Sequence, residues 1–330
     1  MKTLKFGVLS TASVNSYAFL PVIKKVPGAA LDAIASRDLK KARAYAKKHG
    51  IPKAYGDYDS LLADPEITCV YIPLPVSMHA EWSSKAMDAG KHVLCEKPVA
   101  ANEAEALAIA EKAEATGLTF AEAFHYLYHP LMGRVTEIVR SGGIGELVSI
   151  AAVHGVPLTD RNKVQFKPEL AGGALLDIGC YPVNFARVIA GCDDARALEA
   201  VPKMTRSGVD GSMRASLEFE SGVRADINCS LVGYLPMSAV VRGTKGAIYL
   251  LSPFNPAVAL GPACVDIYLI IHQRGLEFRG IRVPTVTSYQ RQLESFCEDV
   301  RAGAAPLTNA REAAANMRLI DAIYEKAGMR

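Results

Sequence analysis

The chain has 330 residues, which is enough for two domains of ordinary size, each with its own core. Half of the residues are hydrophobic and 22% are charged, so the composition excludes a disordered chain. The net charge is only +3 and the basic residues are scattered, which argues against nucleic acid or a membrane surface as the partner.

The N-terminus and the cysteines bear on the compartment. Residues 1–6 run directly into a short apolar strand without the pattern of a signal peptide, and no uncharged apolar run reaches the roughly 18 residues of a membrane span. We therefore expect a soluble, cytoplasmic protein. The seven cysteines form no C-x-x-C pair and their number is odd, which favours buried reduced thiols over a metal site or disulfides.

The first predicted strand runs from Leu4 to Leu9 and a turn follows over residues 10–15. In a dinucleotide-binding fold this turn carries Gly-x-Gly-x-x-Gly, whose glycines allow a tight bend and close approach to a pyrophosphate. Ser, Ala and Asn stand at those positions here; the first two are small, and Asn tolerates positive φ. By itself, the sequence of this turn does not favour a nucleotide site over an ordinary turn. Its candidate cofactor-binding residues are Ser10, Thr11, Ala12, Ser13 and Val14.

The second predicted strand, Ala29 to Ala35, ends in Ser36-Arg37. An NAD enzyme places an acidic residue here against the ribose 2′-hydroxyl, whereas an Arg suits a 2′-phosphate. Asp38 is better explained as the N-cap of a helix over residues 39–49. Ser36 and Arg37 therefore predict NADP(H) as the preferred cofactor, with NAD(H) as a second option. The alternative is an exposed Arg in a βα loop.

Another buried strand, Ile67 to Ile72, ends in Pro73-Leu74-Pro75. Two prolines around one Leu make a stiff loop at the carboxyl edge of the sheet, where Leu74 and Pro75 would face the nicotinamide ribose. His79 lies one turn into the helix that follows. It is either a cofactor contact or a histidine used for capping or for the core.

The stretch from Val93 to Ala100 passes from apolar residues to Glu96-Lys97-Pro98. Pro98 cannot continue a central strand, and Asn102 with Glu three residues later predicts a helix after the turn. Lys97 therefore lies at the carboxyl end of a strand, the edge at which open α/β sheets bind ligands. A surface Lys in a βα loop is the alternative.

A last strand, Leu118 to Ala123, leads into the aromatic and His-rich segment 124–130, which we expect to connect two domains. His125 lies nearest the strand end and is a candidate site residue, whereas His129 precedes Pro130 and a helix and is more readily structural.

Beyond residue 143 the pattern changes to short, often alternating runs separated by Gly-rich turns, which is typical of an antiparallel sheet. The predicted fold is thus an α/β, Rossmann-like dinucleotide-binding domain in residues 1–125, followed in residues 126–330 by an α+β domain for substrate binding and oligomerisation. The second domain is built on an open, mostly antiparallel sheet. Its predicted strands are 147–153, 212–219, 223–231, 238–242 and 247–251, and its final helices are 287–301 and 309–327.

The segment from Ala171 to Asn184 begins with two glycines and then turns apolar, which predicts a helix. Asp177 and Tyr181 are four residues apart and would share one helical face. Both side chains would then address one substrate.

Two of these motifs resemble the Gfo/Idh/MocA family of pyridine-nucleotide oxidoreductases. One is Glu96-Lys97-Pro98 after a strand, and the other is Gly-Gly-x-x-x-Asp-x-Gly-x-Tyr over residues 172–181. The Tyr form is similar to the branch of glucose–fructose oxidoreductase, xylose dehydrogenase and dimeric dihydrodiol dehydrogenase, as are the stretches 36–39, 51–56 and 243–246. The resemblance covers nearly the whole chain.

This resemblance implies hydride transfer between C4 of the nicotinamide and a carbinol or carbonyl carbon of a sugar, sugar derivative or dihydrodiol. Tyr181 would move the hydroxyl proton, Lys97 would favour its phenolate, and Asp177 would orient a hydroxyl or Lys97. The resemblance adds Glu96, Lys97 and His79 to the candidate cofactor-binding residues. The candidate substrate-binding residues are His125, Gln165, Asp177 and Tyr181. No metal is expected. Gln165 stands where some members carry a cleft Arg, which argues against an anionic substrate held at that position.

Two other functions stay open. An NAD-dependent glycosidase of the same fold oxidises, eliminates and rehydrates without net cofactor turnover. A non-catalytic nucleotide-binding regulator is compatible with the missing glycines, although the set of Lys97, Asp177 and Tyr181 argues against it. We expect a small-molecule substrate and a homodimer or homotetramer, because an open antiparallel sheet must cover its apolar face.

Overall fold

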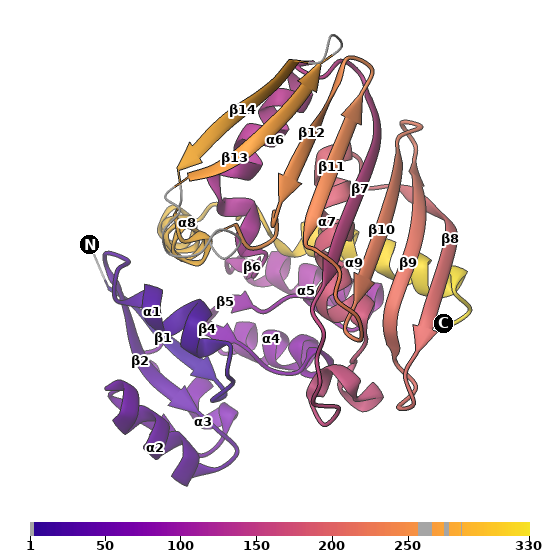
Figure 1. Cartoon of the computed structure of the whole chain (residues 1–330). Helices are drawn as coiled ribbons and strands as arrows, with labels where there is room; N and C mark the ends of the chain where they lie inside the picture. Colours follow the sequence, from indigo (N-terminus) through magenta and orange to yellow (C-terminus); the bar gives the residue numbers. More distant parts are fainter. Residues whose placement is uncertain (1–2, 257–265, 274–276, 285) are drawn as a thin grey trace. The chain divides into compact units, whose positions relative to one another are not determined.

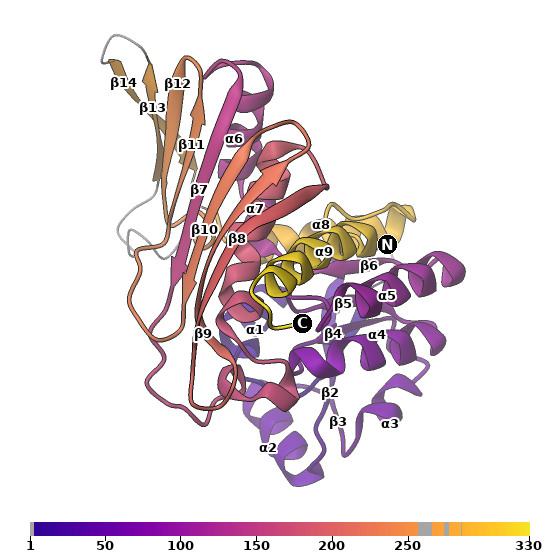
Figure 2. The ribbon, with the colours of Figure 1, turned by 90° about the vertical axis from the view of Figure 1, so that its right-hand side faces the viewer.

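The computed structural model describes residues 3–256, 266–273, 277–284 and 286–330. The chain forms two compact units, whose elements are labelled in Figures 1 and 2. Unit 1 comprises Met1–Phe124 and Tyr289–Ala314, and unit 2 comprises His125–Ser288 and Ala315–Arg330.

Unit 1 is built on a six-stranded sheet in the order β3-β2-β1-β4-β5-β6, and every neighbouring pair is parallel. The order reverses between β1 and β4, as in a doubly wound dinucleotide-binding fold, so the predicted Rossmann-like sheet is confirmed. Ligands of such folds bind at the carboxyl ends of the strands beside this reversal. The strands are β1 Leu4–Leu9, β2 Ala29–Ala35, β3 Lys53–Tyr55, β4 Cys69–Ile72, β5 His92–Cys95 and β6 Phe120–Glu122.

Three helices of unit 1 begin at side-chain caps, two of which, Asp38 and Asn102, the sequence predicts. The side chains of Asp38, Asp57 and Asn102 accept backbone N–H groups of the first turns of α2, α3 and α5. The helix after β1 instead opens with a π-helical turn, η1, before it becomes α-helical. The helical elements are η1 Asn15–Phe19, α1 Leu20–Ile23, α2 Leu39–His49, α3 Tyr58–Leu62, η2 Val76–Met78, α4 His79–Asp88 and α5 Glu103–Thr116.

Residues 289–314 pack into unit 1, which differs from the single boundary near residue 125 that the sequence suggests. The segment contains most of α8 (Ser288–Ala302), whose Leu293, Phe296 and Cys297 enter the same core as Phe6 of β1. The rings of Phe6 and Phe296 have centroids 6.0 Å apart. The apolar face of α8 therefore completes the core of a domain that begins almost 300 residues earlier in the chain.

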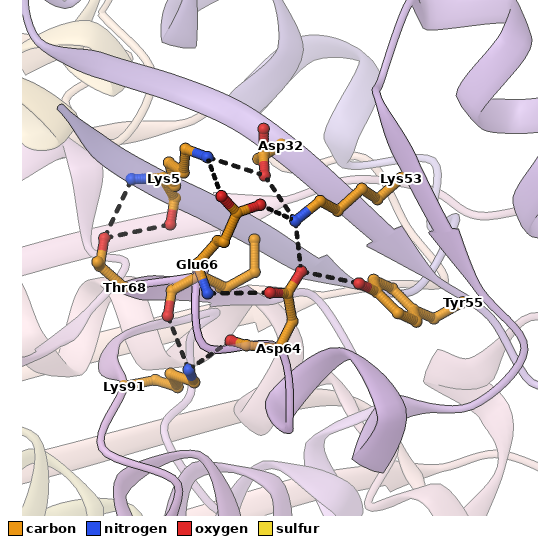
Figure 3. Close-up of polar contacts among 9 residues, drawn as sticks. Lys5, Asp32, Lys53, Tyr55, Asp64, Glu66, Thr68 and Lys91 are labelled. Carbon is orange, nitrogen blue, oxygen red and sulfur yellow. Dashed lines mark hydrogen bonds and ion pairs between the residues drawn. The ribbon is translucent and has the colours of Figure 1, made fainter.

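A charged cluster occupies the amino edge of the same sheet (Figure 3). The Asp64 carboxylate accepts hydrogen bonds from Lys53 Nζ and Tyr55 OH, both at 2.8 Å, and from the Glu66 N–H at 2.9 Å. The buried Lys91 Nζ donates to the backbone carbonyls of Asp64 at 2.8 Å and Ile67 at 2.7 Å. These contacts fix the segments that lead into β3, β4 and β5. Lys5 and Asp32 complete the cluster.

Unit 2 contains an eight-stranded sheet in the order β14-β13-β12-β11-β7-β10-β9-β8. Only β7 and β10 pair in parallel, so the sheet is mixed but mostly antiparallel, as predicted. β8, β13 and β14 were not predicted. β8 has no buried residue, contains Pro202 and changes register between Ala197 and Glu199, so it lacks clean alternation. The strands are β7 Leu147–Gly155, β8 Ala195–Met204, β9 Asp210–Phe219, β10 Arg224–Ser230, β11 Ser238–Gly243, β12 Gly246–Leu251, β13 Asp266–Gln273 and β14 Glu277–Pro284.

The helices of unit 2 lie on one face of this sheet, and no helix within the described residues of the unit covers the opposite face (Figure 2). α7 is buried along most of its length and packs on β7 and β10. The helical elements are η3 His125–Tyr128, α6 Pro130–Arg140, η4 Val164–Phe166, η5 Pro168–Leu170, η6 Leu175–Gly179, α7 Cys180–Ala190 and α9 Ala310–Lys326, of which α9 starts in unit 1.

Candidate active site

The turn after β1 has one residue, Ser10, in a backbone region that glycine favours. Ser10 has φ of 123°, a region that L residues rarely adopt, and it stands at the first glycine position. Its hydroxyl donates to the Pro73 carbonyl at 3.1 Å and accepts from the Ala12 N–H at 3.2 Å, and the Asn15 side chain donates to its carbonyl at 2.9 Å. Three side-chain hydrogen bonds thus hold a backbone geometry that a glycine would adopt without cost.

Backbone donors of this turn are left for a ligand. Within the residues that the structure describes, the N–H groups of Thr11, Ser13 and Val14 have no hydrogen-bond acceptor. They lie at the carboxyl end of β1, directly before η1. Free backbone amides directly before a helix are groups that can bind a pyrophosphate. The residues present therefore fit a dinucleotide.

Ser36 and Arg37 follow β2 at the same edge of the sheet. The Asp38 carboxylate caps α2 through the N–H groups of Lys40 at 2.9 Å and Lys41 at 3.3 Å, as predicted. It forms no ion pair with Arg37, which is exposed and has no carboxylate partner in the described part of the chain. An unpaired guanidinium at this position suits a phosphate.

His79 connects two loops of the carboxyl edge. It is 1% exposed, and its Nδ1 lies 2.8 Å from the Pro98 carbonyl while its Nε2 lies 2.8 Å from the Leu74 carbonyl. Burial lowers the pKa of His79 to about 4, so the ring is neutral at physiological pH and donates to one carbonyl at a time. Any influence of this buried ring on a cofactor would pass through Leu74 and the Lys97-Pro98 turn.

The turn after β5 carries Glu96 and Lys97, and the Lys97–Pro98 peptide is cis. Tyr71 OH in β4 donates to Glu96 Oε1 at 2.5 Å, and the Tyr71 ring stacks on Phe19 at 4.6 Å. Burial, followed by the charge of Glu96, raises the pKa of Tyr71 well above its usual value, so it stays a donor. The core of unit 1 thereby fixes the residue next to Lys97.

The two glycines of the segment 171–184 are required by close contacts in unit 2. A Cβ on Gly172 would lie 2.6 Å from the Gln165 carbonyl oxygen. Gly173 has φ of 130°, and a Cβ on it would lie 2.2 Å from Asp210 Oδ1. The motif therefore allows the chain to pass between a loop and the first residue of β9.

Asp210 anchors the helix that carries Asp177 and Tyr181. Its carboxylate, 1% exposed, accepts from the Leu175 N–H at 2.7 Å and from Tyr324 OH at 3.0 Å. Burial raises the pKa of Asp210 to about 6. Sequence reasoning missed this residue, because its partners are 35 and 114 positions away in the chain.

Asp177 belongs to the π-helical turn η6, and Tyr181 lies in the first turn of α7. The predicted continuous α-helix from residue 171 is thus replaced by loop, π turn and α-helix. A π turn has more residues per turn than an α-helix, so it changes the angle between Asp177 and Tyr181 that regular spacing implies. Such turns occur frequently at functional sites.

Tyr181 lies in an aromatic cluster of unit 2 and is 7% exposed. The ring centroids of His154, Tyr126 and Phe254 lie within 5.5–5.8 Å of its own, and that of His125 lies at 6.2 Å. His125 Nδ1 also lies 2.8 Å from Ser288 Oγ. The structure thus brings His125 and Tyr181 together. It adds Tyr126 and His154, which the sequence analysis did not single out.

Gln165 is the fourth candidate substrate residue. Its side-chain Oε1 is buried and has no hydrogen-bond partner among the described residues. A buried amide oxygen of this kind is costly unless a ligand or water donates to it.

Two further properties concern the described residues as a whole. They contain no group of three or more His, Cys, Asp or Glu side chains able to hold a metal ion. No helix among them is long and apolar enough to cross a membrane.

Comparisons with known proteins agree across the chain. The family described as "Oxidoreductase family, NAD-binding Rossmann fold" (GFO_IDH_MocA) matches residues 4–124, and "GFO/IDH/MocA C-terminal domain" matches residues 132–249. The chain is 38% identical to D-xylose 1-dehydrogenase (NADP(+)) 2 of Haloferax volcanii over 98% of its length and 97% of the relative's. It is 33% identical to trans-1,2-dihydrobenzene-1,2-diol dehydrogenase of Bos taurus over 76% and 75%.

A solved structure is similar over the same extent. A 3-ketoreductase from Actinomadura kijaniata, in complex with NADP and TDP-benzene, superposes with a TM-score of 0.90 at 28% identity and covers 98% of each chain. With both of its parts matched by family descriptions, the chain belongs to the Gfo/Idh/MocA family of oxidoreductases.

Proposed function

We propose that the chain is an NADP(H)-dependent oxidoreductase that transfers a hydride to or from a carbinol or carbonyl carbon of a sugar, sugar derivative or dihydrodiol. The observation that carries the proposal is the Glu96-Lys97 turn, which the core holds at the carboxyl edge of the Rossmann sheet through Tyr71 and His79. The named activities of the relatives from H. volcanii and B. taurus support the substrate class.

The cofactor assignment rests on donors of unit 1. The free amides of Thr11, Ser13 and Val14 would bind the pyrophosphate, and Arg37 would bind the 2′-phosphate. NADP appears with the A. kijaniata reductase and in the name of the xylose dehydrogenase. NADP(H) is therefore the preferred cofactor, and NAD(H) would bind without the contact to Arg37. The nicotinamide supplies or accepts the hydride.

The proton is assigned to Tyr181. A free phenol has a pKa near 10 and is a weak base at neutral pH, so its task requires a positive charge such as Lys97 to favour the phenolate. Asp177, on the turn before, would orient a substrate hydroxyl or the Lys97 ammonium. His125 and the unpartnered Gln165 Oε1 would contact other hydroxyl groups of the substrate.

A panel of aldoses, ketosugars, inositols and dihydrodiols, assayed with NADP(H) and NAD(H), tests this proposal. We expect a change in absorbance at the nicotinamide band with at least one sugar or dihydrodiol, and faster turnover with NADP(H). Product release without that change would instead identify an NAD-dependent glycosidase. Nucleotide binding without turnover of any compound would identify a regulator.

We also infer a homodimer or a dimer of dimers. The face of the unit 2 sheet that carries no described helix presents apolar side chains on neighbouring strands, Val240 of β11 beside Tyr249 of β12 and Ala151 of β7. A second copy of the chain is the cover that such a face requires. Light scattering at micromolar concentration should give at least twice the mass of 35.3 kDa; a monomeric mass would contradict the inference.

A further inference from the structure

A cavity in unit 2 lies outside the segment of Asp177 and Tyr181. Its volume is about 510 Å3, and its walls come from the segment after β7, from the end of β8 with the β8–β9 connection, and from Val232 after β10. Arg161, Lys203 and Arg206 line it, together with Phe166 and the hydroxyl-bearing Thr205 and Ser207. The volume is enough for a small organic ligand.

The charges around this cavity are of one sign. No Asp or Glu lines it, and none of its three cationic side chains has an ion-pair partner in the described ranges. Elsewhere in unit 2, by contrast, Arg187, Arg196 and Arg318 pair with carboxylates. Three like charges around one hollow repel one another, and a bound anion would neutralise them.

The apolar part of the wall points to an organic ligand. Phe166 is 3% exposed, and the guanidinium carbon of Arg161 lies 4.5 Å from its ring centroid. This stacking orders the Arg161 fork and leaves its N–H groups to bind oxygen atoms. Thr205 and Ser207, whose hydroxyl oxygens are 3.0 Å apart, add polar groups to the lining. Phosphate oxygens accept hydrogen bonds from guanidinium and hydroxyl donors of this kind.

The cavity adjoins the candidate substrate residues. Phe166 follows Gln165, whose carbonyl accepts the Gly173 N–H at 3.0 Å, and the Gly173 carbonyl accepts the Asp177 N–H at 3.0 Å. Building on the function proposed above, we propose that this cavity binds the phosphate or diphosphate group of an organic substrate whose sugar reaches the Asp177–Tyr181 segment. Gln165 is uncharged, so the positive charge for such a group comes from Arg161, Lys203 and Arg206 instead.

Direct binding tests the cavity without turnover. The full chain is saturated with NADPH, so that the phosphate contacts of unit 1 are occupied, and titrated calorimetrically with thymidine diphosphate, inorganic pyrophosphate and uncharged thymidine. We expect one site per chain for thymidine diphosphate, weaker binding of pyrophosphate and little of thymidine. Each of Arg161→Gln, Lys203→Gln and Arg206→Gln should weaken thymidine diphosphate binding about tenfold or more, the loss expected for one charge-assisted contact.

Lys163→Gln is the matched control, because this exposed Lys is on the same loop as Arg161 but does not line the cavity. It should leave binding unchanged. The proposal is overturned if thymidine diphosphate does not saturate, if it binds no better than pyrophosphate, or if the control loses as much as the three variants. If the chain transfers hydride but binds no diphosphate, the proposed function stands and the diphosphate subsite is refuted. If it binds diphosphate but turns over no substrate, the subsite stands and the proposed function is refuted.

Discussion

The two edges of the six-stranded sheet in unit 1 use charge in opposite ways. At the amino edge, Lys53, Asp64 and Glu66 satisfy one another, and Lys91 uses its ammonium on two backbone carbonyls (Figure 3). At the carboxyl edge, Arg37 and the N–H groups of Thr11, Ser13 and Val14 have no such partner in the described part of the chain. Groups that are satisfied within the protein serve its stability, whereas unsatisfied groups are available to a ligand.

β5 links the two edges within one strand, because Lys91 precedes it at the amino edge and Lys97 follows it at the carboxyl edge. Lys97→Met should lower turnover by about 100-fold or more, the magnitude expected when a positioned group of acid–base catalysis is lost. Cofactor affinity and melting temperature should change little. Tyr181→Phe should do the same if it moves the proton. Single-turnover kinetics and nucleotide titration measure both effects.

Lys91→Met is the control for Lys97→Met. It removes two buried hydrogen bonds, so it should lower the melting temperature while turnover of the folded enzyme stays near that of the unmodified chain. Full activity of Tyr181→Phe would show that the proton donor is misassigned, and His125, beside it in the aromatic cluster, would be the next candidate.

Arg37→Ala should weaken NADPH binding by about 1.5–3 kcal/mol, or roughly 10–100-fold, because a charge-assisted contact to the 2′-phosphate is lost. NADH binding should be almost unchanged. Fluorescence titration with both nucleotides measures the difference, and Arg43→Ala, an exposed Arg on α2, is the control. Equal affinities of the unmodified chain for NADPH and NADH would contradict the assignment of Arg37.

Asp64→Asn probes the amino edge. Burial opposes ionisation of Asp64, but hydrogen bonds from Lys53, the Glu66 N–H and Tyr55 lower its pKa from 3.8 to about 2. The folded-state pKa is thus depressed, so this carboxylate stabilises the fold above about pH 4 and loses that effect as pH falls toward 2. The substitution should cost roughly 1–3 kcal/mol of unfolding free energy at pH 7.

Denaturant unfolding at several pH values measures this effect. The difference between the unmodified chain and Asp64→Asn should shrink below about pH 4, and turnover at pH 7 should be the same in both. A large loss of turnover in a fully folded Asp64→Asn enzyme would break the contrast between the two edges.

Sequence patterns predicted the elements whose signals are local. The strand Leu4–Leu9 and the caps Asp38 and Asn102 are confirmed because each depends on residues within about one turn of chain. The Rossmann-like sheet was also predictable from the sequence, although the glycines of the Gly-x-Gly-x-x-Gly motif are absent. Ser10 adopts the positive φ of the motif through contacts to Pro73 and Asn15, and no local signal announces this.

What sequence reasoning missed depends on contacts between distant residues. Asp210 meets Gly173 and Tyr324 only in the folded chain, and α8 enters the core around Phe6 from the other end of the sequence. The π turn at Asp177 is a further case, since apolar periodicity does not separate it from a regular helix. The pairing of functional groups was thus harder to predict than their identity.

The smallest expected effect concerns Asp210. This carboxylate is satisfied within the protein and also holds the turn that carries Asp177, so it tests the contrast between groups that serve stability and groups that serve the site. Burial raises its pKa to about 6, and the other titratable groups that face it, Tyr324 and Cys229, are kept protonated by burial. As pH falls through about 6, Asp210 gains a proton, its bond to the Leu175 N–H weakens, and turnover should decline.

The stability of the fold should instead increase as pH falls through this range. The folded-state pKa is raised, so the contribution of Asp210 to stability is fully present below about pH 4 and is lost as pH rises through 6.

Tyr324→Phe tests this assignment without removing the carboxylate. The Tyr324 hydrogen bond lowers the pKa of Asp210, so its loss should shift the acid limb of the pH–turnover profile to higher pH. A net hydrogen-bond contribution of about 0.5–1.5 kcal/mol corresponds to a shift of roughly half a unit to one unit. Tyr234→Phe, at an exposed Tyr of the same unit, should leave the limb in place. If the two profiles coincide, Asp210 does not govern the acid limb, and its anchoring of the Asp177 turn serves folding alone.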